Sequence, residues 1–182
     1  MEKCLIDYCS PTLASLKSAS LFNYRFSSRE ELESDLSRWN RELSAKGVEL
    51  TVLNTDAGRA LVYVYRRSAL ESDLARSDIR VFLSGYGYDS FDVQSAVSRL
   101  RHRTALCGSF PHEIGVFLGY PLGDVIGFIE NRGKNSKCAG CWKVYCNECE
   151  ALKTFERFKK CREIYERLWR EGRSVLRLTV AA

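Results

Sequence analysis

The chain has 182 residues, of which 45% are hydrophobic and 28% charged, and its net charge is +5. This composition is ordinary for a globular protein and argues against intrinsic disorder, and the length suits a single domain over residues 1–182. Residues 1–91 carry 12 basic and 13 acidic side chains, whereas residues 92–182 carry 16 and 10. A basic excess of this size permits an acidic partner, but it is also common in proteins that bind no polyanion.

The sequence predicts a cytoplasmic protein without a membrane role. Its first residues lack the basic start and apolar run of a secretory signal, and no later apolar stretch approaches the roughly 20 residues that a bilayer requires. Because the cytoplasm keeps thiols reduced, the eight cysteines are interpreted as thiols or metal ligands and not as a disulfide framework.

The first segments predict a helix and a strand. Residues 2–17 have a helical pattern, but the pair Ser10-Pro11 should break it, because a proline fits the first turn of a helix and here would restart one. Residues 21–26 alternate between two faces, which indicates a strand.

A capped helix and a hairpin follow. Ser28 and Glu31 form a capping box, in which each side chain satisfies a backbone amide of the first turn, so we expect a helix over residues 28–46. Residues 48–54 and 59–65 are rich in β-branched and aromatic side chains and flank a polar loop that contains glycine. This pattern predicts an antiparallel hairpin.

The remaining chain is mostly helical in pattern. Further helices are expected over residues 68–84 (as two short helices), 91–107, 111–118, 121–131 and 148–170. One more strand is expected over residues 142–146, and residues 174–182 form either a strand or a loose end. The predicted architecture is an α+β fold, in which a small antiparallel sheet of three or four strands packs with about six helices.

Two Cys-x-x-Cys pairs are the most conspicuous candidates for chemistry. Cys138 pairs with Cys141, and Cys146 with Cys149, so four thiolates are available for zinc or an iron–sulfur cluster. However, four residues separate the pairs, where zinc ribbons usually place about 15 to 20. A strand over those residues would also hold the pairs about 16 Å apart. Ordinary reduced cysteines are the alternative.

Cys9 and the pair His112-Glu113 are further candidates. A thiol just before a helix start would ionise more readily at the positive end of the helix dipole, so Cys9 could be a nucleophile, a redox group or an axial haem ligand. The alternative is that Cys9 is a small buried hydrophobe. His112 beside Glu113 could act as a general base or a metal ligand, or the two could be a solvated pair in a first helical turn.

Residues 113–130 also fit a helix-turn-helix, with Gly119 at the turn. Reading DNA requires polar side chains on the second helix, whereas its outer positions here are mainly small or apolar and include an acid. The supporting charges are Arg132, Lys134 and Lys137. A corner of two helices used for packing is the alternative.

Several runs of the sequence together resemble one family. They are Cys9-Ser-Pro-Thr-Leu-Ala, Gly58-Arg-Ala-Leu-Val-Tyr-Val-Tyr-Arg66, residues 110–129 and Gly140-Cys-Trp-Lys-Val-Tyr145. Over almost the entire chain, they are similar to the bacterial domain-of-unknown-function family numbered 3793. The resemblance implies no assigned activity and tilts the interpretation toward iron or redox biology. The chain departs from the family pattern at Tyr8, where histidine is expected, and in having Cys146 and Cys149.

These observations support hypotheses of different classes. The first is a cytosolic accessory protein of iron or redox metabolism that binds iron, zinc, haem or a redox protein partner. It would act through Cys9, Cys138 and Cys141, with His112 as a helper. The alternative is a nucleic-acid-binding regulator built on residues 113–130. An enzyme that uses Cys9 or His112 in a cleft is the third.

Overall fold

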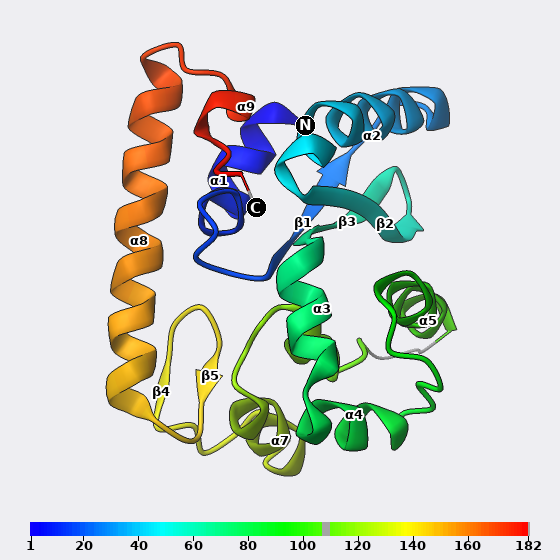
Figure 1. Ribbon diagram of the computed structural model, residues 1–182, viewed down its shortest axis with the longest axis vertical. Coiled ribbons are helices and arrows are strands. Elements are labelled where there is room, and N and C mark those ends of the chain that lie inside the picture. Colours follow the sequence, from blue (N-terminus) through cyan, green and yellow to red (C-terminus); the bar gives the residue numbers. More distant parts are fainter. Residues whose placement is uncertain (107–109, 182) are drawn as a thin grey trace.

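The computed structural model describes residues 1–106 and 110–181 and has an α+β architecture (Figure 1). In chain order, its elements are α1 (Glu2–Leu13), β1 (Ala19–Arg25), α2 (Arg29–Leu43), the 3-10 helix η1 (Ser44–Lys46), β2 (Val48–Asp56), β3 (Arg59–Arg66), α3 (Arg67–Ala75), α4 (Ser77–Ser84), α5 (Val93–Leu106), α6 (Ile114–Phe117), α7 (Leu122–Glu130), β4 (Cys138–Ala139), β5 (Lys143–Val144), α8 (Glu148–Arg170) and α9 (Val175–Leu178).

The central sheet is antiparallel and has the strand order β1, β3, β2. A two-residue turn, Ala57-Gly58, joins β2 to β3, and both of its residues have positive φ, at 43° and 76°. That geometry matches the right-handed twist of the paired strands. The predicted hairpin is therefore confirmed, and each of its strands is longer than expected.

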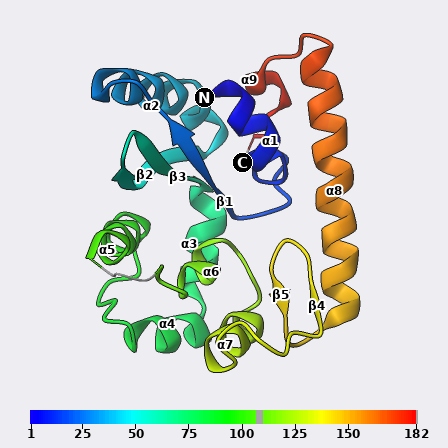
Figure 2. The same ribbon diagram turned by 180° about the vertical axis from the view of Figure 1, so that it is seen from behind.

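Both faces of β3 are covered, which explains its nearly unbroken apolar sequence. Val62 and Val64 pack into a core with α1 and α2, whereas Tyr63 and Tyr65 pack into a second core with α3, α4 and α5. Seen from both sides, α1, α2 and α9 gather at one end of the molecule, and α3 to α7 form the other (Figures 1 and 2). The long helix α8 runs beside both parts.

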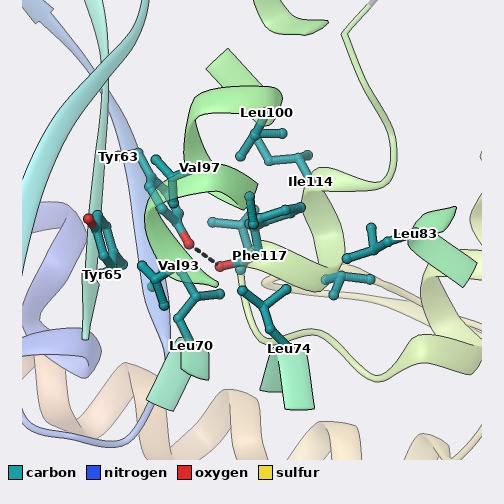
Figure 3. Close-up of a cluster of buried hydrophobic side chains, with 14 of the residues drawn as sticks. Tyr63, Tyr65, Leu70, Leu74, Leu83, Val93, Val97, Leu100, Ile114 and Phe117 are labelled. Atoms are coloured by element: carbon teal, nitrogen blue, oxygen red, sulfur yellow. Dashed lines mark hydrogen bonds between the residues drawn. The ribbon is translucent and has the colours of Figure 1, made fainter. Parts of the chain in front are cut away.

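The second core ties the helical part to the sheet (Figure 3). The Tyr63 hydroxyl donates a hydrogen bond of 2.6 Å to the carbonyl of Phe117 in α6. Leucines of α3 and α4 and valines of α5 surround this bond. Because a buried hydroxyl is costly without a partner, this bond fixes the position of α6 and of the segment that follows it.

The break predicted at Ser10-Pro11 is wrong, because α1 continues without interruption to Leu13. Pro11 lies in the last turn, where the missing amide costs one backbone hydrogen bond. The Arg66 guanidinium caps the end of the helix, because its Nε and Nη2 donate hydrogen bonds of 2.6 Å each to the carbonyls of Thr12 and Leu13. A contact from a distant strand therefore determines how α1 ends.

Other differences concern short elements. Within residues 111–118, the helix is limited to Ile114–Phe117. The residues before it form a turn that places the Glu113 side chain in the core. The strand expected over residues 142–146 contracts to β5, which pairs with the unpredicted β4. The tail forms α9. The helix expected over residues 91–107 is α5, and Cys107 lies outside the described residues.

Candidate functional site

A buried carboxylate holds the segment that carries the cysteines. Asp124, in the first turn of α7, is 3% exposed and accepts three hydrogen bonds of 2.8 Å each. Its Oδ1 accepts hydrogen bonds from the backbone amides of Tyr145 and Cys146, and its Oδ2 accepts one from Nε1 of Trp142. These bonds offset the cost of burying the charge and attach residues 138–146, here called the cysteine hairpin, to α7.

Small residues of α7 permit this close approach. A Cβ at Gly123 would lie 2.5 Å from the Cys146 sulfur, and a Cβ at Gly127 would lie 2.6 Å from the Tyr145 ring. At Gly123 the Cys146 thiol could rotate away, but at Gly127 the base of the Tyr145 side chain cannot, so Gly127 is required where the cysteine hairpin packs.

Trp142 lies at the centre of an aromatic cluster that links α7 to α8. Its ring stacks on Tyr120 with centroids 5.0 Å apart and meets the edge of Phe155 at 4.6 Å. Because its indole nitrogen is bound to Asp124, the ring is fixed in both position and orientation. Trp142 thereby forms a wall shared by two cavities.

The first cavity, here called the aromatic cavity, has a volume of about 390 Å³. It lies between α6, α7 and the cysteine hairpin. Its lining consists of Phe110, His112, Ile114, Gly115, Leu118, Tyr120, Asp124, Val125, Phe128, Ala139, Gly140, Trp142 and Lys143. Volume and lining are those of a site for a small, largely apolar molecule.

The second cavity, of about 270 Å³, lies on another side of Trp142 and is lined in part by Lys17, Cys146 and Glu150. The Lys17 ammonium lies 4.9 Å from the centre of the Tyr120 ring. Burial lowers the pKa of Lys17 to about 8, since removal from water penalises the charged form. At neutral pH this lysine therefore remains a cation, and a small rise in pH discharges it.

Cys141 faces cations, whereas Cys138 faces an anion. The Arg162 guanidinium of α8 approaches the Cys141 sulfur to 4.0 Å, and Lys17 also acts electrostatically on this thiol. By contrast, desolvation and then the Glu148 carboxylate raise the pKa of the Cys138 thiol. The two thiols of the first Cys-x-x-Cys pair are thus placed in opposite electrostatic surroundings.

The second pair is exposed at the start of α8. Desolvation and then the Asp124 carboxylate raise the pKa of the Cys146 thiol, and Cys149 lies in the first turn of the helix. Within residues 1–106 and 110–181, no group of three or more His, Cys, Asp or Glu side chains is arranged to hold a metal ion.

Cys9 lies inside α1 and not ahead of a helix start, because Pro11 does not begin a new helix. It is fully buried among the apolar side chains that α1 packs against the sheet. Burial raises the pKa of the Cys9 thiol far above its ordinary value. The helix-dipole argument for a reactive Cys9 therefore has no geometric basis in this fold.

We expect iodoacetamide to distinguish these thiols in the folded protein. Cys149, which is exposed, should be alkylated in the native protein, whereas Cys9 should react only after denaturant has unfolded the chain, because alkylation requires an accessible thiolate. Peptide mass spectrometry at successive times measures the order. Alkylation of Cys9 at the rate of Cys149 under native conditions would contradict this placement.

His112 and Glu113 do not form an acid–base pair. Glu113 is 1% exposed, forms an ion pair with Arg103 and lies 3.5 Å from the Tyr88 hydroxyl. His112 is exposed, meets the edge of the Phe128 ring at 5.1 Å and lines the aromatic cavity. The expectation of a solvated pair is wrong for Glu113, whose carboxylate has a structural partner in the core.

The segment proposed as a helix-turn-helix packs into the fold on its second helix. Asp124, Val125 and Gly127 of α7 are buried, and the cysteine hairpin lies against the helix. Beyond it, Arg132, Lys134 and Lys137 are exposed, and Lys137 donates to the carbonyl of Cys146 at 2.6 Å. The exposed charges therefore follow α7 and do not lie on it.

A family model described as "Protein of unknown function (DUF3793)" matches residues 5–179. The chain belongs to the DUF3793 family. The resemblance drawn from the sequence is thereby confirmed. Comparison with curated proteins and with solved structures found no match. In the part of the DUF3793 chain that the structure describes, no helix is both long and apolar enough to cross a bilayer.

The aromatic cavity coincides with the runs that carry the DUF3793 resemblance. Of its lining residues, all but Ala139 fall within residues 110–129 and 140–145. Sequence reasoning had found Cys138, Cys141 and His112 but had missed Lys17 and Arg162. No spacing links the last two to the cysteines, so the fold alone brings them together.

Proposed function

We propose that this DUF3793 protein is an accessory protein of redox metabolism that exchanges electrons with a disulfide-bearing partner through Cys138 and Cys141. The observation that carries the proposal is the asymmetry between these thiols: cations face Cys141, and the Glu148 carboxylate faces Cys138. A dithiol needs one thiol that attacks and one that resolves, and such asymmetry assigns the two roles.

Cys141 is the attacking thiol in this proposal. The nucleophile in disulfide exchange is the thiolate, which a neighbouring cation stabilises. Arg162 and Lys17 supply that charge, and the thiol is half-buried at the surface of the cysteine hairpin, where a partner can approach it.

The proposed exchange is balanced by the partner. The Cys141 thiolate attacks a partner disulfide, a mixed disulfide forms, and the displaced partner thiolate takes up a proton. The Cys138 thiolate then attacks the Cys141 sulfur, which releases the second partner thiol. The chain has lost two electrons and two protons to the partner, and an external dithiol reverses the process.

Trapping of a mixed disulfide tests the assignment of Cys141 as the attacking thiol. In Cys138→Ser, incubation with glutathione disulfide should accumulate a stable mixed disulfide at Cys141, because the resolving thiol is absent. Arg162→Met in that background should slow the trapping by up to about fivefold at low salt, since an exposed cation next to an anion contributes at most about 1 kcal/mol. Intact mass and peptide mapping measure both.

Lys160→Met is the matched control, because it removes an exposed cation from the same helix and should leave the trapping rate within about twofold. Equal trapping at Cys146, Cys149 and Cys141 would contradict the proposal. So would about one iron, zinc or haem per chain in anaerobically purified protein that is lost in Cys138→Ser. That result would assign the thiols to metal or haem binding.

A further inference from the structure

The aromatic cavity has the features of a preformed small-molecule site. Its volume of about 390 Å³ lies within the range of roughly 300–1,000 Å³ typical of ligand pockets. The rings of Tyr120 and Trp142 stack on each other along one wall, and Phe128 contributes another ring. Planar walls of this kind favour a flat aromatic ligand, because stacked and edge contacts add to simple apolar burial.

The shape of the cavity depends on a residue that has no side chain. A Cβ at Gly115 would lie 2.7 Å from a methyl group of Val125 and 3.4 Å from the Tyr120 ring. The Val125 side chain or α7 itself would have to shift to admit it. The close packing of α6 on α7 therefore fixes this wall independently of any ligand.

The lining offers a ligand a cation that has free hydrogen-bond donors. Among the described residues that line the cavity, the carboxylate is that of Asp124, and both of its oxygens already accept hydrogen bonds from the cysteine hairpin. The Lys143 ammonium donates one bond of 2.5 Å to the carbonyl of Gly133 and lies 6.0 Å from the Phe128 ring centre, which leaves it further N–H donors. His112 adds an imidazole to the lining.

We propose that the aromatic cavity binds a planar aromatic or heteroaromatic small molecule that carries one anionic group. The rings of the ligand lie between Trp142 and Phe128, and Lys143 binds its anionic group. Neither Cys138 nor Cys141 lines the cavity, but Ala139 and Gly140, which lie between them, do.

The fluorescent anion 8-anilinonaphthalene-1-sulfonate provides the test. We expect one site per chain, with enhanced dye fluorescence and quenching of tryptophan emission, since Trp142 forms a wall. Ala139→Trp should weaken binding at least tenfold: Ala139 is exposed on the rim, so a large ring there fills the cavity without repacking the core. Lys134→Trp, also exposed but outside the lining, is the matched control and should bind as the parent does.

The charge requirement is tested separately. Lys143→Met should weaken binding of the sulfonate about fivefold and leave binding of the neutral N-phenyl-1-naphthylamine unchanged. Several dyes per chain, or equal binding in Ala139→Trp and the parent, would overturn the proposed site. A loss of affinity for both dyes in Lys143→Met would overturn the anion preference. Binding of the sulfonate should be unaltered in Cys138→Ser, which removes the resolving thiol but no lining residue, so the two proposals fail independently.

Discussion

Arg66→Met should lower the free energy of unfolding by about 3 kcal/mol. Arg66 is 2% exposed, and its guanidinium donates to the carbonyls of Thr12, Leu13 and Val180 at 2.6 to 2.8 Å. Methionine fills similar space but removes all three bonds, and a buried acceptor that finds no other partner costs about 1–3 kcal/mol. The carbonyls of Thr12 and Leu13 keep the backbone amides of Ser15 and Val180 as donors. Burial of the Arg66 cation is itself unfavourable and lowers its pKa, so removal of the charge offsets part of this cost.

Arg67→Met is the control for this measurement. The adjacent Arg67 is exposed, and its ion pair with Glu49, at 2.6 Å, lies at the surface, so its loss should cost less than about 1 kcal/mol. Urea unfolding of both variants gives the two free energies. Equal destabilisation by the two substitutions would show that the carbonyls at the end of α1 do not depend on Arg66.

Asp124→Ala should cost about 3 kcal/mol and release the cysteine hairpin from α7. The substitution removes the common acceptor of two backbone amides and the Trp142 indole. Amide exchange at Tyr145 and Cys146 should therefore accelerate more than exchange in the central sheet. Urea unfolding and hydrogen exchange measure the two effects.

Two further variants sharpen this prediction. Asp124→Asn keeps one acceptor oxygen for the backbone amides and should recover part of the lost stability. Glu130→Ala, at the exposed end of the same helix, should change stability by no more than about 0.5 kcal/mol. If Asp124→Ala behaved like Glu130→Ala in both measurements, the hairpin would be held by its apolar contacts alone.

The sequence predicted the elements whose signals are local. The turn at Ala57-Gly58 and the alternation on either side of it define the β2–β3 hairpin. Ser28 accepts a hydrogen bond from the amide of Glu31 at 3.2 Å, as the capping box predicted. The Glu31 carboxylate accepts from the amide of Ser27, one residue before the expected amide of Ser28. Helix α8 was predicted from its long apolar periodicity, and the structure has it over Glu148–Arg170.

The predictions from sequence failed where residues distant along the chain determine the local structure. Pro11 would end a helix on local grounds, but Arg66, from the far end of the hairpin, satisfies the last turn. Strand β4 is two residues long and has no periodicity to detect. Glu113 was placed in solvent because nothing nearby in sequence shows that Arg103 would meet it in the core.

Part of the candidate site was predictable, because some of its residues have a local signal in the sequence. Cys138 and Cys141 follow from their spacing, and His112 from its rarity in the chain. Lys17, Arg162 and the aromatic cavity depend on packing among the α1–β1 loop, α7, α8 and the cysteine hairpin, which no motif records. Asp124 had been counted as an acid unfavourable to DNA binding, whereas it anchors the hairpin that carries the thiols.

A redox titration of the purified protein tests the central claim most directly. The protein is equilibrated with graded ratios of reduced and oxidised glutathione, quenched in acid, alkylated and mapped by peptide mass. We predict one reversible disulfide, between Cys138 and Cys141, at a potential within the span of about −270 to −120 mV that dithiol oxidoreductases cover. A chain whose Cys138 and Cys141 remain separate thiols throughout, or pair with Cys146 or Cys149, would contradict the account.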